Sequence, residues 1–328
     1  MRALLMTGPS HGVDRTEIRE IEEPRPGPGE VTIDVAYAGV NFMDVMARRG
    51  DAGYVGAWPY APGLEVSGAV REIGPGVTDL AVGQRVGAFT AGGGLAAVAL
   101  VRAEFVVPVP EGVQSSVAAA APLMLTTALL VLRDAARFRP GETVLMHSAS
   151  GGVSSAVAQL VPVLGGGLCI GTVGRPVKVA LVLKSGYDVA VARGEDLAEA
   201  VRAATGGAGA DIVLDPLGAL LETDLAVTAP GGRIVLFGNA GGGEQVPLPP
   251  AGRLIGGNLA IGGFSMRGLW ATAPHRASSG LRQVLDLITQ GQLDIAITEV
   301  GSLADVPAVH QLLAEGRGDG KYVARLQG

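Results

Sequence analysis

The sequence is poor in cysteine, in charge and in long apolar runs, and each shortage excludes a class of protein. A single cysteine, Cys169, excludes an internal disulfide and any zinc site built from several thiolates, which fits a reducing cytoplasm. Charged residues make up 17% of the 328 residues, the net charge is −6, and Lys and Arg form no run. This balance argues against nucleic acid and anionic membranes as partners. A small-molecule substrate is the expected partner.

The longest apolar stretches are too broken to cross a bilayer. They lie around 118–132 and 153–164 and are interrupted by Pro122, Gln159 and Pro162. A transmembrane helix needs about 20 consecutive apolar residues. We therefore expect no membrane-spanning segment.

The first six residues, MRALLM, are too short an apolar run for a secretory signal and end near a Gly-Pro pair. Hydrophobic residues make up 48% of the chain, enough for the cores of two domains. We expect a soluble, cytoplasmic, globular protein.

The pattern of the chain changes at about residue 120. Before it, segments such as VTIDVA (31–36) and VSGAVREI (66–73) alternate apolar and polar residues between Gly/Pro turns, which predicts a mostly antiparallel β domain. After it, short apolar strands are separated by helical or turn-rich segments, which predicts a doubly wound parallel sheet. These strands are expected at 143–146, 168–172, 212–215 and 234–237.

The last part of the chain is expected to return to the first domain. It contains an amphipathic helix near 278–290, a strand at 295–300, a further helix and a final apolar segment at 320–326. The sequence thus indicates an α/β protein in which a β domain is split around a nucleotide-binding domain.

The segment HSASGGVSSAVAQL, at 147–160, has the layout of a dinucleotide-binding turn. An apolar strand enters a turn of small residues, and an Ala/Val-rich helix follows, so that the helix N-terminus can meet a pyrophosphate. Gly151 and Gly152 have no side chains, so a pyrophosphate could approach the backbone of the turn closely. Ser154 stands where a third glycine, which allows close packing of helix on strand, is expected.

Eight motifs in order resemble those of zinc-free medium-chain reductases, the quinone oxidoreductases and the enoyl reductase domains of polyketide synthases. They lie at 39–44, 62–65, 83–86, 125–127, 147–159, 171–174, 232–239 and 320–323. The resemblance implies a GroES-like β domain (1–120 and 265–328) around a Rossmann domain (121–264). It also implies a homodimer, for which the apolar segment 256–263 is suited as a paired edge strand.

The resemblance also bears on metal. Zinc-dependent relatives have a cysteine and a histidine at the positions that here are Asn41 and Leu64, and a four-cysteine lobe follows. Because these ligands are missing, we expect no metal-binding residues. Without a Lewis acid, the implied reaction is hydride transfer to an electrophilic C=C bond or a quinone, on a small hydrophobic substrate, with a polyketide-like intermediate as one option.

NADPH is the expected cofactor. An NAD-preferring relative would carry an acidic residue after the second strand, whereas this chain has Arg175 and Lys178, which suit a 2′-phosphate. The alternative is a solvated basic loop. The expected cofactor-binding residues are Thr127, Ser150, Gly151, Gly152, Val153, Gly174, Arg175, Lys178, Arg193, Phe237, Gly238, Asn239, Phe264 and Met266.

Three departures from the family pattern leave cofactor binding open. Ser154 adds a side chain that a small tilt of its helix could absorb, in which case Ser154→Gly should tighten binding. Pro162 is expected to interrupt the same helix, and Ala192 replaces a tyrosine often found near the adenosine phosphate. If the nucleotide site has decayed, the alternative is a non-redox protein that binds a ligand or catalyses a cyclisation or dehydration.

Asn41 and Tyr54 are the expected catalytic residues. Asn41 would line the cleft near the nicotinamide, and Tyr54 could donate a proton after hydride transfer, although a packing role is equally open for Tyr54 and Tyr60. Asp44 is expected to orient backbone and His147 to be structural. Asp215 could contact the cofactor or cap a turn.

Overall fold

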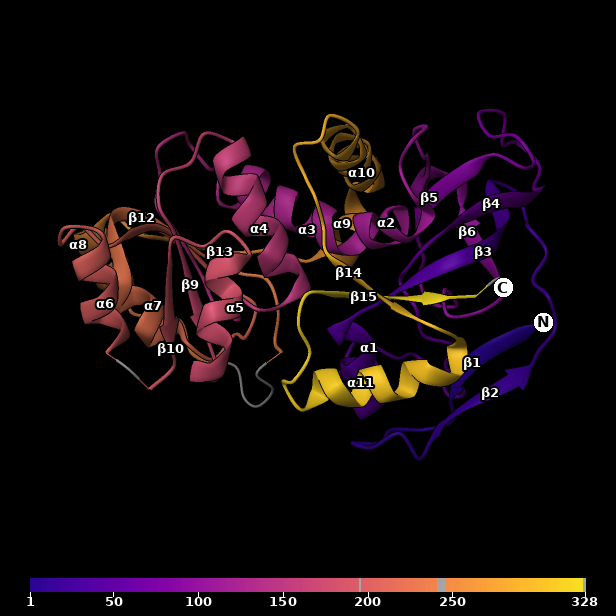
Figure 1. Ribbon diagram of the computed structural model, residues 1–328, viewed down its shortest axis with the longest axis horizontal. Coiled ribbons are helices and arrows are strands. Elements are labelled where there is room, and N and C mark those ends of the chain that lie inside the picture. Colours follow the sequence, from indigo (N-terminus) through magenta and orange to yellow (C-terminus); the bar gives the residue numbers. More distant parts are fainter. Residues whose placement is uncertain (195, 241–245, 327–328) are drawn as a thin grey trace. The chain divides into compact units, whose positions relative to one another are not determined.

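The computed structural model describes residues 1–194, 196–240 and 246–326 (Figure 1). The chain divides into two units, one formed by Met1–Thr126 with Leu269–Gly328 and the other by Thr127–Gly268. The sequence placed the two boundaries at 120/121 and 264/265.

The first unit is built on a seven-stranded sheet in the order β14-β15-β3-β4-β5-β7, with β6 paired to β3. Its pairings are antiparallel apart from β14 with β15. The strands are β3 (Glu30–Val40), β4 (Glu65–Ile73), β5 (Arg85–Phe89), β6 (Val98–Arg102), β7 (Val106–Pro108), β14 (Ile297–Val300) and β15 (Lys321–Arg325). A separate antiparallel pair consists of β1 (Arg2–Met6) and β2 (Thr16–Glu20).

The C-terminal segment completes this sheet, as the sequence predicted. β15 runs antiparallel to β3, with Tyr322 opposite Val40 and Arg325 opposite Tyr37 (Figure 1). This pairing brings Lys321, the first residue of β15, to the end of β3. The helices of the unit are α1 (Phe42–Arg49), α2 (Ser115–Ala120), α10 (Pro274–Thr289) and α11 (Val306–Ala314), with α9 (Met266–Thr272) at the boundary.

The second unit contains a six-stranded parallel sheet in the order β10-β9-β8-β11-β12-β13. This is the order of a Rossmann sheet, so the predicted fold class is confirmed. Its strands are β8 (Val144–Met146), β9 (Cys169–Val173), β10 (Val189–Ala192), β11 (Ala210–Asp215), β12 (Thr228–Leu236) and β13 (Ala260–Gly263). Its helices are α4 (Gly152–Val163), α5 (Val179–Lys184), α6 (Leu197–Ala204), α7 (Leu221–Val227) and α8 (Ala251–Gly257).

The central strands of the second unit are apolar because both faces of the sheet are covered. Leu145, Ile170, Val213 and Ile234 are completely buried in one cluster. Cys169 is buried too, and burial raises the pKa of its thiol to about 12, so the thiol is unreactive at neutral pH.

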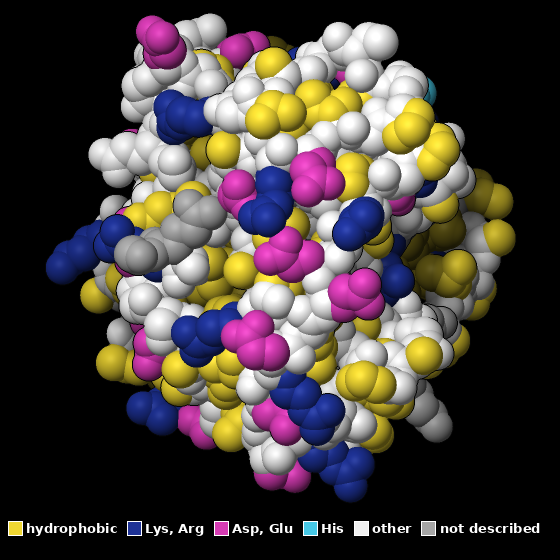
Figure 2. Space-filling model, turned by 90° about the vertical axis from the view of Figure 1, so that its right-hand side faces the viewer, with side chains coloured by type: hydrophobic (Ala, Val, Ile, Leu, Met, Phe, Trp, Pro, Cys, Tyr) yellow, Lys and Arg dark blue, Asp and Glu magenta, His cyan; other side chains and the backbone are white. Residues whose placement is uncertain are grey.

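The most apolar helical stretch, Ser115–Ala135, is long enough to cross a membrane, but 89% of its most apolar window is buried inside the protein. It consists of α2, a π-helical turn at Ala121–Leu125, α3 (Thr126–Leu130) and a second π-helical turn at Val131–Ala135. Basic and acidic side chains are interspersed on the face shown in Figure 2. The burial of Ser115–Ala135 is that of a core helix.

Candidate functional site

The predicted dinucleotide turn lies between β8 and α4, and we call residues 147–152 the glycine turn. Ser148 has a positive φ of 56°, the left-handed region that residues other than glycine seldom adopt. Its carbonyl oxygen accepts hydrogen bonds from the Gly151 N–H and from the Ser154 hydroxyl, both at 2.9 Å. Ser154 is 3% exposed. The hydroxyl that replaces the third glycine therefore has a partner inside the turn.

The expected interruption of α4 by Pro162 is wrong. The helix extends through Pro162 to Val163, and the Leu164 N–H still donates to the Leu160 carbonyl at 2.9 Å. A proline in the last turn displaces few helical hydrogen bonds. The end of α4 beside the glycine turn is thus undisturbed.

Basic side chains lie where the second and third strands of the unit end, and we call Arg175, Lys178 and Arg193 the basic group. A Cβ atom at Gly174, the residue after β9, would overlap the Arg193 guanidinium. The Arg193 side chain therefore lies against the end of β9. Lys178 Nζ is 3.3 Å from the Ser150 hydroxyl, which links the basic group to the glycine turn.

Other predicted cofactor residues follow β12 and β13 at the same edge of the parallel sheet. The Phe237 N–H donates to the Asp215 carbonyl, and the Phe264 N–H donates to the Leu236 carbonyl. The Asp215 carboxylate accepts the N–H groups of Leu217 and Gly218, at 2.6 and 3.1 Å. Of the two roles that the sequence left open for Asp215, turn capping is the one observed.

His147 is a structural residue, as predicted. It is completely buried, and its Nδ1 and Nε2 atoms lie 2.7 Å from Thr172 Oγ1 and Asp224 Oδ1. Burial raises the pKa of the Asp224 carboxyl, while the hydrogen bond and charge of His147 oppose that shift. These contacts join the first residue of the glycine turn to β9 and α7.

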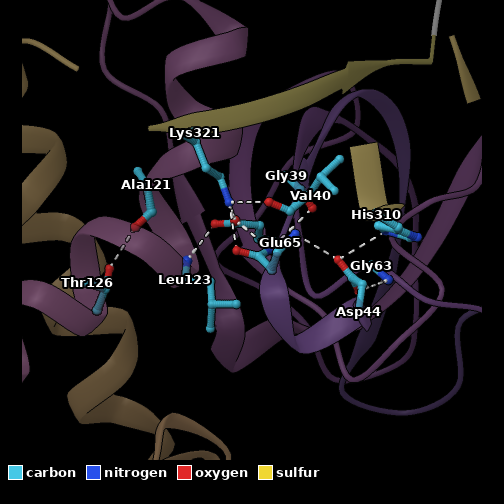
Figure 3. Close-up of polar contacts among 11 residues, drawn as sticks. Gly39, Val40, Asp44, Gly63, Glu65, Ala121, Leu123, Thr126, His310 and Lys321 are labelled. Carbon is cyan, nitrogen blue, oxygen red and sulfur yellow. Dashed lines mark hydrogen bonds and ion pairs between the residues drawn. The ribbon is translucent and has the colours of Figure 1, made fainter. Parts of the chain in front are cut away.

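A second polar cluster lies in the first unit, around the predicted catalytic residue Asn41, and we call it the Asn41–Glu65–Lys321 network. Figure 3 labels its charged members, Glu65 and Lys321. Lys321 Nζ donates to Asn41 Oδ1 at 2.7 Å, to the Val40 carbonyl at 3.2 Å and to Glu65 Oε1. Asn41 Nδ2 donates to Glu65 Oε1 at 2.9 Å and to the Gly39 carbonyl at 3.3 Å. The three ammonium hydrogens and the Asn41 amide thus have partners inside the protein.

Glu65 connects this network to the apolar helix. Its other carboxylate oxygen, Oε2, accepts the Leu123 N–H at 2.7 Å (Figure 3). Leu123 lies in the π-helical turn that contains Pro122, where the regular helical hydrogen bonds are displaced. Glu65 is 0% exposed and Lys321 3%, so the ion pair is buried.

Asp44 orients backbone, as predicted. Its carboxylate accepts the N–H of Asn41 at 2.8 Å and that of Gly63 at 3.1 Å. Burial raises its pKa to about 6, although these two hydrogen bonds favour the charged form. His310 Nε2 lies 3.9 Å from Asp44 Oδ2, and burial lowers the pKa of His310 to about 3.

The predicted residues therefore fall into two groups. The predicted cofactor-binding residues all belong to the second unit, whereas the predicted catalytic residues, Asn41 and Tyr54, belong to the first. Tyr54 is half-buried in the loop after α1, and its N–H donates to the Asp51 carbonyl. Tyr60 pairs with Met6 through backbone hydrogen bonds.

Sequence reasoning missed the partners of Asn41. Glu65 and Lys321 stand in two of the eight motifs, PGLE at 62–65 and GKYV at 320–323, as the single charged residue of each. Charge inside an apolar motif was the available signal for a buried pair. No group of three or more His, Cys, Asp or Glu side chains suited to a metal occurs in the described ranges, and Leu64 is 5% exposed.

The chain matches two family models in the expected order. Residues 27–111 match the alcohol dehydrogenase GroES-like domain, and residues 152–290 match the zinc-binding dehydrogenase model. A quinone oxidoreductase of Pseudomonas aeruginosa is 32% identical over 95% of this chain and 96% of its own length. The chain belongs to the medium-chain dehydrogenase/reductase family.

Members of the medium-chain family with solved structures have the same fold. The Escherichia coli quinone oxidoreductase complexed with NADPH is 26% identical, with a TM-score of 0.90 over 99% of this chain and 100% of that one. A mycobacterial protein complexed with NADPH is 31% identical, with a TM-score of 0.89 over 99% and 100% of the two chains.

Larger family members also match. A spectinabilin polyketide synthase system protein of Streptomyces orinoci is 33% identical over 90% of this chain, which spans 13% of that protein's length. A phenolphthiocerol/phthiocerol polyketide synthase subunit of Mycobacterium tuberculosis is 31% identical, and the chain spans 14% of it.

Proposed function

We propose that this protein reduces a quinone or a conjugated enone by hydride transfer from NADPH, without zinc. The observation that carries the proposal is the basic group beside the glycine turn. After β9 the chain continues Gly174-Arg-Pro-Val-Lys178, with no carboxylate to bind a free ribose 2′-hydroxyl. Guanidinium and ammonium groups are suited to a 2′-phosphate instead.

The residues present fit this cofactor. The turn backbone at Gly151, Gly152 and Val153 would receive the pyrophosphate at the N-terminus of α4. The basic group would hold the 2′-phosphate, and the residues after β12 and β13 would line the nicotinamide half. Bound NADPH would supply the hydride; the chain's own residues orient the substrate and supply the proton.

We assign Asn41 to the wall of the substrate site and Tyr54 to proton donation. The Asn41 amide and the Lys321 ammonium donate their hydrogens to oxygen atoms of the protein. We therefore assign neither group as the proton donor to a substrate. A phenol can protonate the enolate left by hydride addition. Zinc has no place in this scheme, because an amide and a leucine stand at the ligand positions.

The remaining parts of the proposal concern the surroundings of the enzyme. We propose a cytoplasmic homodimer that acts on a small hydrophobic substrate, with a polyketide-like intermediate as one option. Neither nucleic acid nor a membrane is a proposed partner, in keeping with the net charge of −6.

The test measures NADPH oxidation with a benzoquinone and with a simple conjugated enone, each with and without a chelator. We expect turnover that the chelator leaves unchanged. Tyr54→Phe should lower enone reduction by about a hundredfold, within the usual range for a lost general acid, while Tyr60→Phe keeps it. Loss of activity with the chelator contradicts the zinc-free scheme, and equal rates for both variants contradict the role of Tyr54.

The non-redox alternative rests on Ser154, Pro162 and Ala192 as signs of a decayed site. Two of these have structural explanations, since Ser154 is bonded within the turn and Pro162 lies at the far end of α4. Absence of any NADPH binding by the wild type would favour the alternative.

A further inference from the structure

Ser154 is the residue at which this chain departs from the pattern of its nucleotide turn, and its surroundings are unusual. The hydroxyl donates to the carbonyl of Ser148, a residue held in the left-handed conformation. The carbonyl of Ser154 itself accepts the hydroxyl of Tyr187 at 2.7 Å, and Tyr187 is 3% exposed. Ser154 is thus bonded on one side to the turn and on the other to the segment before β10.

We propose that Ser154 is a positioning residue that holds the glycine turn in the conformation able to bind a pyrophosphate. The proposal rests on the function proposed above. It reverses the interpretation of the sequence, in which Ser154 is a fault that glycine would repair.

The physical argument begins at Ser148. A left-handed residue other than glycine is unfavourable and persists only where the surroundings hold it. Two donors converge on the Ser148 carbonyl, one from the Gly151 backbone and one from the Ser154 side chain. Removing the Ser154 hydroxyl leaves the Ser148 carbonyl with one donor and makes the turn less ordered in the unbound protein. Cofactor binding must then order the turn, and this cost lowers the affinity.

The same hydroxyl fixes α4 against the turn. A glycine at position 154 packs closely on a strand but cannot donate a side-chain hydrogen bond. Here the serine provides a bond across six positions, from the first turn of the helix to the residue after His147. Ser155 is the matched contrast, because its hydroxyl bonds back to the Gly152 carbonyl at 2.7 Å and leaves the Ser148 carbonyl untouched.

The pattern of cofactor losses identifies the role. The pyrophosphate is common to NADPH and NADH, so a looser turn lowers the affinity for both cofactors by the same factor. Loss of a 2′-phosphate contact, in contrast, weakens NADPH alone. Because the Ser154 hydroxyl is bonded within the glycine turn, we expect KM for NADPH to rise in its variants while kcat at saturating NADPH stays unchanged.

The experiment compares wild type, Ser154→Ala, Ser154→Gly and Ser155→Ala by titration with NADPH and with NADH. Ser154→Ala and Ser154→Gly should each weaken both cofactors by about three- to tenfold, the effect of one lost hydrogen bond, and Ser155→Ala should match wild type. Tighter binding by Ser154→Gly, or an effect on NADPH alone, overturns the proposal.

Hydrogen exchange separates this inference from the proposed function. The Gly151 amide, which bonds to the Ser148 carbonyl, should exchange faster in Ser154→Ala than in wild type and in Ser155→Ala. If the wild type binds neither nucleotide, the proposed function fails and only the exchange result bears on the turn. Unchanged exchange at Gly151 contradicts the positioning role in either case.

Discussion

Lys321 illustrates what a single buried residue contributes to this fold. A buried ion pair stabilises a protein only where hydrogen bonds satisfy both charges, because each charge loses its hydration. Here the ammonium has three oxygen partners, and the two Glu65 oxygens accept the Asn41 amide and the Leu123 N–H as well. Removing one partner leaves an uncompensated carboxylate.

Lys321→Met should therefore lower the free energy of unfolding by about 3 to 5 kcal/mol, measured by urea denaturation. Arg317→Met is the control, since its ion pair with Glu315 is 61% and 42% exposed and should contribute less than about 1 kcal/mol. Equal losses for the two variants would show that burial of the pair has no special cost.

His310 predicts a pH dependence whose sign follows from its buried, neutral ring. The folded pKa of about 3 lies below the ordinary 6.5, so below pH 6.5 the unfolded chain gains a proton that the folded protein does not. The stability contribution of neutral His310 is complete above pH 6.5 and is lost progressively down to about 3. Asp44 acts oppositely, because its raised pKa makes folding more favourable as the pH falls from 6 to 3.8.

Comparison with a variant isolates the His310 effect. Between about pH 7 and pH 4.5, His310→Gln should gain about 2 to 3 kcal/mol in free energy of unfolding relative to wild type. The exposed His275, changed to Gln, is the control and should show no such gain. A pH-independent difference between His310→Gln and wild type would refute the titration argument.

At the scale of elements, β13 is the strand at which we place the interface of the proposed homodimer. It is the last strand in the sheet order, Ala260 on it is exposed, and Ile255 on the preceding α8 is 75% exposed. A largely exposed edge strand with an apolar neighbour favours pairing with a second copy.

Ala260→Lys should therefore convert a dimer into a monomer in light scattering, because the charge would be buried by strand pairing. Val82→Lys places the same charge at a position 67% exposed in the first unit and should remain dimeric. A monomeric wild type would end the dimer proposal, and a dimeric Ala260→Lys would place the interface elsewhere.

The elements were also where prediction from sequence worked best. Alternation at 31–36 and the apolar run at 212–215 are local signals, and both lie in strands of the structure, β3 and β11. Pro162 was misjudged because a proline's effect depends on how far the helix continues beyond it. Glu65 and Lys321 are 256 positions apart, so no local pattern could pair them.

For the whole molecule, the proposed chemistry is divided between the two units. The first unit carries Asn41 and Tyr54, and the second carries the glycine turn and the basic group. Residue types at the basic group are enough to favour NADPH, since recognising a phosphate by charge needs no detailed geometry. The position of the Ser154 hydroxyl did need it.

The most direct test of the account is a calorimetric comparison of NADPH and NADH on wild type, Arg175→Ala and Arg193→Ala, with the exposed Arg202 changed to Ala as control. We predict that wild type prefers NADPH. Each of the two variants should lose about ten- to a hundredfold in NADPH affinity with NADH almost unaffected, as expected for one charge-assisted hydrogen bond. A wild type that binds NADH as tightly as NADPH, or equal losses for both nucleotides, would contradict the account.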